Sequence, residues 1–155
     1  SDQLALSFYS ESYPYHPDDN PRGWRHWRGT ITVTGATLAS AELVDLQNLS
    51  VQSLVQDPAT PGQLTFSTLT RGDHSTVLLS FADNADNARI SIALESSNET
   101  GSGPPQLRRH QRIPGATVQL SARDMVDDQV MADMSIDGFK DTITLSRHGS
   151  IPMDV

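Results

Sequence analysis

Aromatic residues crowd a short segment near the start of the chain and are its first candidates for binding chemistry. Residues 13–27 hold both tryptophans and two of the three tyrosines. Flat aromatic rings beside hydrogen-bonding groups suit the faces of sugar rings. The candidate ligand-binding residues are Trp24, Trp27, Tyr13, Tyr15 and His26. The alternative is a structural role, in which the two tryptophans cover an open end of the protein core.

Aspartate-rich turns are the second group of candidates, and the chemistry they suggest is calcium binding. Asp83, Asp86 and Asn87 lie within five residues, and residues 124–128 hold a second acidic group. Calcium prefers hard oxygen ligands in flexible loops. Neither segment has the glycine and distal glutamate of the helix–loop–helix calcium motif, and aspartate and asparagine are also standard turn residues. A metal site at Asp83, Asp86 and Asn87 and a purely structural turn therefore both stay open.

The sequence contains none of the common catalytic patterns. It has no nucleophile elbow, no glycine-rich phosphate loop, no cysteine and no His-x-His pair, and its five histidines are scattered. We therefore expect no catalytic residue and no cofactor in this chain. The tripeptide Arg71–Gly72–Asp73, an integrin-recognition sequence, lies at an expected hairpin tip. It belongs to the hypothesis that the chain is a secreted or surface interaction protein.

Charge and composition argue against several classes of protein. The formal net charge is -8, and an acidic surface opposes the phosphate contacts that give nucleic-acid binders their affinity. No run approaches the roughly 20 apolar residues of a membrane-spanning helix, so we expect no membrane span. The chain has 18 serines and 13 threonines but one lysine and four glutamates. Because β-forming and turn residues outnumber long charged helix formers, a helical bundle is not expected.

Alternation of apolar and hydroxyl side chains is the main structural signal, and it recurs along the chain. A period of two places the apolar residues on one face of a strand and the serines and threonines on the other. The alternating apolar sets are Leu4, Leu6 and Phe8; Ile31 and Val33; Leu64 and Phe66; Val77, Leu79 and Phe81; Ile90, Ile92 and Leu94; Val118 and Leu120; Ile143 and Leu145. Turn residues separate these runs at intervals of about 8–12 residues, as in a sandwich or barrel. The sequence predicts an all-β fold, an antiparallel β-sandwich of two packed sheets.

Three segments fit this pattern less clearly. Residues 39–54 suit one helix or two short strands, and their β-branched content favours strands. Residues 123–134 suit a short helix or a strand, because their apolar residues fit both a helical spacing and an alternation. Residues 97–114 are too rich in glycine, proline and polar residues for regular structure, so we expect a long loop that is mobile or functional.

We expect a single domain. Within it, residues 1–23 form an N-terminal strand and a loop rich in aromatic residues and proline, and residues 24–155 form the sandwich. The chain starts at Ser1 without methionine, so we expect a processed chain or a piece of a larger protein. The lack of cysteine fits either redox compartment, and an extracellular or periplasmic location is favoured.

Several runs, in their order along the chain, resemble part of a known protein family. They are residues 27–36 (WRGTITVTGA), 64–79 (LTFSTLTRGDHSTVLL), 88–92 (ARISI) and 137–147 (DGFKDTITLSR). The order is similar to the β-sandwich region that follows the catalytic domain in large bacterial metal-dependent hydrolases related to the polymerase-and-histidinol-phosphatase (PHP) superfamily. The resemblance spans most of residues 24–148 and rests on structural features, namely a tryptophan, glycines, turns and alternating aliphatic residues.

The resemblance implies a non-catalytic accessory module that packs on, or assists, a hydrolase domain encoded elsewhere in the gene. The family's metal ligands, a His-x-His pair with further histidine and aspartate residues, have no counterpart here, so no catalytic residue is carried over. The leading hypothesis is therefore an accessory sandwich with a structural or substrate-positioning role. Its partner would be the missing catalytic domain or another protein surface. The alternatives are a carbohydrate-binding module that uses Trp24 and Trp27 to hold a glycan, and the secreted or surface interaction protein.

Overall fold

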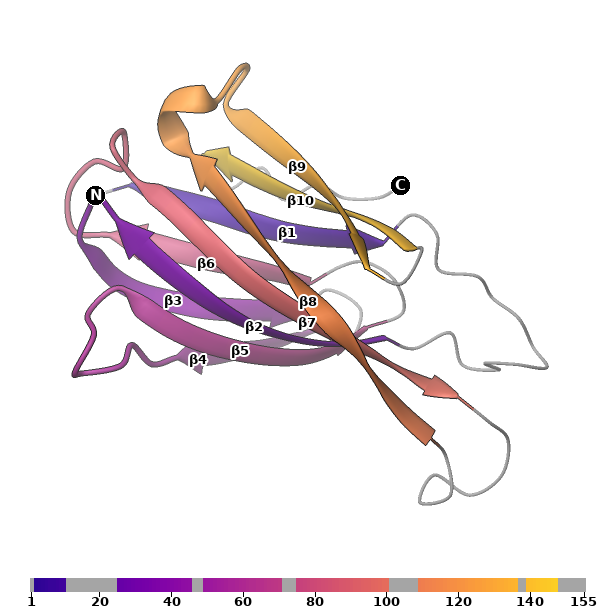
Figure 1. Ribbon diagram of the computed structural model, residues 1–155. Helices are drawn as coiled ribbons and strands as arrows, with labels where there is room; N and C mark the ends of the chain where they lie inside the picture. The colour runs from indigo at the N-terminus through magenta and orange to yellow at the C-terminus, as the bar shows by residue number, and fades with distance from the viewer. Residues whose placement is uncertain are drawn as a thin grey trace.

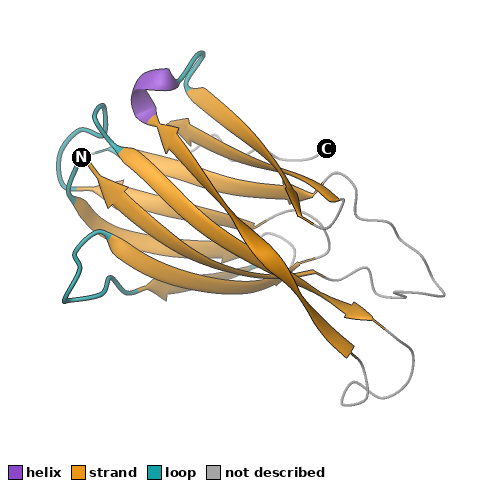
Figure 2. Cartoon of the chain, viewed as in Figure 1, coloured by secondary structure: helices purple, strands orange, loops and turns teal. Residues whose placement is uncertain are grey.

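The chain folds almost entirely into strands. The computed structural model describes residues 2–10, 25–45, 49–70, 75–100, 109–136 and 139–147 (Figure 1). Apart from one turn of 3-10 helix, η2 (Ala122–Asp124), the regular structure of these residues is all strand (Figure 2). The strands are β1 (Gln3–Ser10), β2 (Arg25–Thr34), β3 (Leu38–Asp45), β4 (Ser50–Leu54), β5 (Gln63–Thr70), β6 (Ser75–Phe81), β7 (Arg89–Thr100), β8 (Arg109–Ser121), β9 (Gln129–Ile136) and β10 (Phe139–Arg147).

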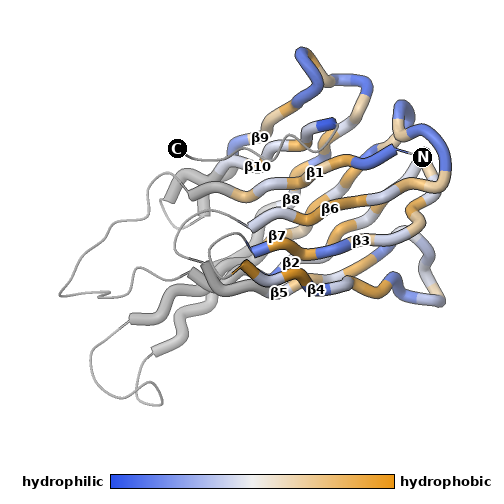
Figure 3. The backbone as a smooth tube through the Cα atoms, turned by 180° about the vertical axis from the view of Figure 1, so that it is seen from behind, coloured by the Kyte–Doolittle hydropathy of each residue, from blue (hydrophilic) through white to orange (hydrophobic). Residues whose placement is uncertain are grey.

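The strands form two antiparallel sheets that pack face to face. The larger sheet has six strands in the order β4-β3-β6-β1-β10-β9, and the smaller has four in the order β5-β2-β7-β8. Figure 3, drawn from behind, shows the six strands following one another from the β9 edge to the β4 edge. The chain passes between the sheets at several connections, one of which is the β8–β9 corner, where η2 lies (Figure 1). The prediction of an all-β antiparallel sandwich is confirmed.

The core lies between the sheets and consists of the alternating apolar residues found in the sequence. In β1, for example, Leu4 and Leu6 are fully buried and Phe8 is 4% exposed. Every residue of the seven alternating sets is buried except Val118, which is partly buried against the same core. The register aligns these residues across each sheet, so that Leu6 lies opposite Val77 on one side and Leu145 on the other. A continuous apolar layer therefore joins the two sheets.

The strand expected within residues 1–23 is β1, and it lies inside the larger sheet. It pairs with β6 on one side and β10 on the other. The backbone of Asp2 extends this pairing, because its carbonyl accepts from the N–H of Phe81 at 2.8 Å and its N–H donates to Asp83 at 3.2 Å. The first residues of the chain are therefore integral to the sandwich.

Residues 39–54 form two strands, as their composition favours. β3 and β4 pair in antiparallel register, with Ala41 opposite Leu54 and Asp45 opposite Ser50. Leu49, in the turn just before β4, has a φ of 52°, a left-handed conformation that breaks an extended run. The reversal at this point explains why the segment does not continue as a single element.

Of the two alternatives left open for residues 123–134, a short helix or a strand, the structure has the strand, apart from the 3-10 turn η2. Asp127 and Asp128 both have a positive φ, 54° and 62°. Val126 and Gln129 exchange backbone hydrogen bonds of 2.9 and 3.2 Å across them, which closes a two-residue hairpin turn. Aspartate tolerates the left-handed conformation that such a turn requires. The segment that follows this turn is the strand β9, so its apolar residues follow the alternation of a strand and not the spacing of a helix.

The prediction of a long loop over residues 97–114 is wrong at both ends of this range. β7 continues to Thr100 and β8 begins at Arg109, with Ser97 opposite Arg112 and Asn98 opposite Gln111. The register between these strands shifts between Leu94 and Ser96, and Pro114 lies at this irregularity. A proline has no N–H to donate and is tolerated at such a bulge. Residues 101–108 lie outside the described part of the chain.

Candidate functional site

One end of the sandwich holds a group of paired charges contributed by both ends of the chain. Nη1 of Arg147 lies 2.8 Å from Oδ2 of Asp2 and 3.1 Å from Oδ1 of Asp86. The same oxygen of Asp2 accepts the backbone N–H of Ala85 at 2.9 Å. The Arg147 and Asp2 side chains are 14% and 17% exposed, so this pair is largely withdrawn from water. The arrangement ties β1, β10 and the loop between β6 and β7 together.

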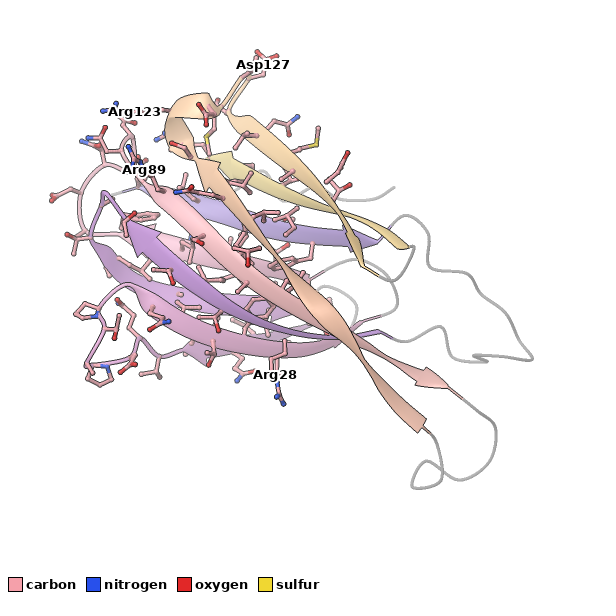
Figure 4. The ribbon with its side chains drawn as sticks, viewed as in Figure 1. Arg28, Arg89, Arg123 and Asp127 are labelled. Atoms are coloured by element: carbon pink, nitrogen blue, oxygen red, sulfur yellow. The ribbon has the colours of Figure 1, made fainter. Side chains whose placement is uncertain are left out.

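A second arginine fixes the same loop from the β8–β9 corner. The guanidinium of Arg123 donates to Oδ1 of Asn87 from Nε at 3.0 Å and from Nη2 at 2.5 Å. The backbone N–H of Ala122 donates to the carbonyl of Ala88 at 3.0 Å. Figure 4 shows Arg123 at the same end of the molecule as Arg89 and Asp127. The side chains at this end therefore link the strand connections to one another.

The calcium ligands suggested by the sequence take part in these links. Asp86 pairs with Arg147, and Asn87 accepts from Arg123. The backbone N–H of Asp86 donates to Oδ1 of Asn84 at 3.2 Å, as in an aspartate/asparagine turn. Across the described ranges, no group of three or more His, Cys, Asp or Glu residues could hold a metal ion. The turn interpretation is therefore favoured, and calcium binding at Asp83, Asp86 and Asn87 remains a prediction without support.

The aromatic candidates are only partly within the described residues. Tyr13, Tyr15 and Trp24 lie outside them, while the backbones of His26 and Trp27 belong to β2. Successive residues of a strand occupy opposite faces, so these two register positions do not share a face of the sheet. The side chains of all five aromatic candidates lie outside what the structure describes, so the stacking platform stays a prediction.

The backbone of Trp27 is paired on both sides within the four-stranded sheet. Trp27 is opposite Thr68 of β5 and Ser96 of β7, two residues before Gly29. Gly29 and Ile31 are core-side positions of β2, and both are buried. The backbone position of Trp27 is therefore in step with Gly29 and Ile31 in the alternation of β2, and that of His26 is out of step with them.

The middle of the outer face of the four-stranded sheet carries uncharged hydrogen-bonding side chains, between the exposed Arg28 and Arg89 of the same outward series. Two rows of paired residues cross it, and their hydroxyl and amide members are Thr30, Thr32, Gln63, Thr65, Ser91, Thr117 and Gln119. Each of these is partly or fully exposed. Arg28 lies at one end of this face and points away from the sheet (Figure 4). We call this surface the hydroxyl face.

The paired charges carry no signal in the sequence. Asp2 and Arg147 are 145 positions apart, and Asn87 and Arg123 are 36 apart. No local spacing connects such residues, because the contact exists only once both sheets have formed. Part of the hydroxyl face, in contrast, is visible in the sequence as Thr30 and Thr32, which alternate with Ile31 and Val33.

Comparisons with known proteins found no relative of this chain. No family model, no curated protein and no solved structure matches this chain. The likeness to the sandwich region of PHP-related hydrolases therefore stays a prediction. Among the residues that the structure describes, no helix is long and apolar enough to cross a membrane.

Replacing Asp2 by alanine is expected to lower the free energy of unfolding by about 1–3 kcal/mol. The change removes the carboxylate that lies 2.8 Å from the mostly buried guanidinium of Arg147, and it removes the acceptor of the Ala85 N–H. Urea unfolding followed by circular dichroism measures the loss. Asp83→Ala, at an exposed position of the same loop, is the matched control and should change stability by less than about 0.5 kcal/mol. Equal effects of the two substitutions would contradict a specific role for the pair.

Proposed function

We propose that this chain is a non-catalytic β-sandwich module that accompanies a metal-dependent hydrolase domain and supports its structure or positions its substrate. The observation that carries the proposal is the set of large apolar side chains exposed at both edges of the six-stranded sheet. Beside β4 these are Leu49, Val51 and Val55, and beside β9 they are Val126 and Met131. Exposed apolar surface is typical of a protein that docks on another.

The charged side chains support the same proposal. At the end of the sandwich that holds the β6–β7 loop and the β8–β9 corner, Arg147 and Arg123 bind acceptors of this chain at distances between 2.5 and 3.1 Å. These groups stabilise connections between strands. A module whose polar groups hold its own loops, and whose apolar groups face outward, is suited to a structural role beside another domain.

Hydrolysis assays test whether the chain is non-catalytic. Generic phosphate esters and carboxylic esters are incubated with the purified chain and added Zn²⁺ or Mn²⁺. We expect the rate of the metal-containing buffer alone. Turnover that rises in proportion to protein concentration and is lost on heating would refute the proposal.

The association with a hydrolase has its own test. Sequencing the gene upstream of Ser1 shows whether the reading frame continues into a histidine-rich metal-binding domain. Such a domain is the expected result. A stop codon and an independent start immediately before Ser1 would overturn the accessory role while leaving the non-catalytic sandwich intact.

The hydroxyl face favours carbohydrate binding as a second candidate function. Neutral hydroxyl and amide side chains match the hydrogen-bonding groups of sugars without the desolvation cost of charges. Isothermal titration calorimetry with a panel of glycans measures this binding. Thr32→Val, which removes a hydroxyl from the centre of the face, should weaken it, and Thr144→Val on the other sheet should not. Absence of binding to every glycan would rule out this candidate.

A further inference from the structure

The β4 edge of the six-stranded sheet lacks the usual protection of an edge strand. Within the described residues β4 pairs with β3 alone and is the last strand of the sheet. Edge strands normally carry charges, prolines or bulges that prevent pairing with another chain. The sequence of β4, Ser-Val-Gln-Ser-Leu, has no charge and no proline, and its register with β3 is regular. Ser50 to Ser53 are all exposed.

Charge is distributed away from this edge. Residues 46–70 contain a single charged residue, Asp57, although the chain has a net charge of -8. Residues 122–133, around the β8–β9 corner, contain five: Arg123, Asp124, Asp127, Asp128 and Asp133. In Figures 1 and 3 the β8–β9 corner and β4 lie on opposite sides of the sandwich. Two copies that met through β4 would therefore bring their neutral sides together and keep their acidic corners apart.

We propose that β4 is a homodimerisation edge, at which two copies pair their β4 strands antiparallel about a two-fold axis. The register that pairs all five residues is centred on Gln52. It sets Gln52 opposite Gln52 of the second copy, Ser50 opposite Leu54 and Val51 opposite Ser53. No like charges face each other in this register, and the two six-stranded sheets join into one.

The other edges explain why the second copy binds β4 and why the assembly closes. β9 carries Asp133, and β8 carries arginines and Pro114, features that oppose strand pairing. β5 is uncharged, but its described outward side chains are glutamine, threonine and serine, whereas Leu49 and Val55 flank β4 with exposures of 88% and 81%. A single competent edge that pairs with itself gives a closed dimer and not a fibre. The edge is short, so we expect a weak, concentration-dependent association.

Sedimentation equilibrium of the full chain tests the dimer. The weight-average mass should rise with concentration from 16.9 kDa toward twice that value and no further. Val51→Lys adds a charge at an exposed edge position and should keep the chain monomeric, with circular dichroism unchanged. Met131→Lys is the matched control on the β9 edge, where the residue is 59% exposed, and should leave dimerisation intact. A monomer at every concentration, or dissociation by Met131→Lys instead of Val51→Lys, would overturn the proposal.

Disulfide trapping tests the register, and the chain is suited to it because it has no cysteine. In the proposed dimer the two Gln52 Cα atoms are about 4.5–5.5 Å apart, within disulfide range. The two Ser50 Cα atoms are separated by four residues along the strand, about 13 Å, which is too far. Gln52→Cys should therefore form a covalent dimer under mild oxidation while Ser50→Cys does not. Equal cross-linking of both variants, or species larger than dimers, would refute the two-fold β4 pair.

The inference does not depend on the proposed function. It concerns the isolated chain, whose mass is measured without a hydrolase or a glycan. It also leaves the β9 edge, with Val126 and Met131, free to meet a second domain. A monomeric chain would therefore overturn the dimer and leave the accessory role standing.

Discussion

Replacing Phe66 by alanine is expected to lower the free energy of unfolding by about 3–5 kcal/mol. Phe66 is 3% exposed, and its ring lies 5.1 Å from the ring of Phe8, centroid to centroid, with an interplanar angle of 32°. Phe8 belongs to β1 of the six-stranded sheet and Phe66 to β5 of the four-stranded sheet. The pair therefore joins the two layers. Small domains are stable by about 5–15 kcal/mol in total, so its loss brings the fold close to unfolding.

The ring of Phe66 also covers Gly29, which lies directly opposite it in β2. A Cβ added at Gly29 would lie 2.7 Å from Cζ of Phe66 and 3.2 Å from Cδ1 of Leu94. An aromatic ring over a strand glycine compensates for the missing side chain. Gly29→Ala alone should therefore be destabilising, because the ring must move. In the Phe66→Ala background the same methyl group enters the space that the ring has left.

A double-mutant cycle of Gly29→Ala and Phe66→Ala measures this coupling. We expect the combined loss to be smaller than the sum of the two single losses by about 0.5–3 kcal/mol. Urea unfolding gives each stability. Thr65→Ala, at the exposed neighbouring position of β5, is the control and should change stability by less than about 0.5 kcal/mol. Strict additivity would show that the ring does not fill the space at Gly29.

Most strands of this fold were predictable because alternation is local. A strand with one buried face must repeat every two residues, so runs such as Leu4, Leu6 and Phe8 indicate both the element and its inner face. The same rule applies to Ile90, Ile92 and Leu94 in β7. The inward positions of such a strand can be predicted without knowing its neighbours, because packing on any apolar core requires the same alternation.

Local signals were ambiguous in one segment and misleading in another. At residues 123–134 a helical spacing of apolar residues competed with alternation, and Asp127 and Asp128 decided the outcome by adopting left-handed conformations. At residues 97–114 the many loop-forming residues concealed a hairpin stem, since Ser97 and Arg112 pair only because β7 and β8 are already aligned further along. The β-strand propensity of single residues predicts polar strand ends poorly, because pairing with a neighbouring strand outweighs it.

The side-chain links at the end of the sandwich were beyond prediction for a different reason. Arg147 meets Asp2 because β1 and β10 are neighbours in the sheet, which is a property of the strand order. No residue type or spacing in the sequence specifies that order. The candidate residues that the sequence did supply, Asp83, Asp86 and Asn87, were found by composition alone. Composition cannot separate a metal ligand from a turn residue paired with arginine.

Replacing Gly35 by alanine is expected to lower the free energy of unfolding by about 2–5 kcal/mol. Gly35, in the turn between β2 and β3, has a φ of 78°, which is costly for any residue with a Cβ. An added Cβ would also collide with the backbone oxygen of Asn87 and lie 3.0 Å from its carbonyl carbon. A peptide group, unlike a flexible side chain, has no rotamer by which to withdraw. The loop between β6 and β7 would have to move, and with it the hydrogen bonds that Arg123 donates to Asn87.

Comparing two substitutions separates strain from collision at Gly35. Asparagine tolerates a positive φ far better than alanine but places a Cβ at the same position. If the collision dominates, Gly35→Asn and Gly35→Ala lose similar stability in urea unfolding, and both expose the amides of residues 84–88 to hydrogen exchange. Thr34→Ala, at the exposed preceding position, should leave both measurements unchanged. Recovery of most of the stability by asparagine would instead assign the cost to the backbone angle. In that case the turn and the loop are merely neighbours, and the links through Asn87 do not depend on the absence of a side chain at Gly35.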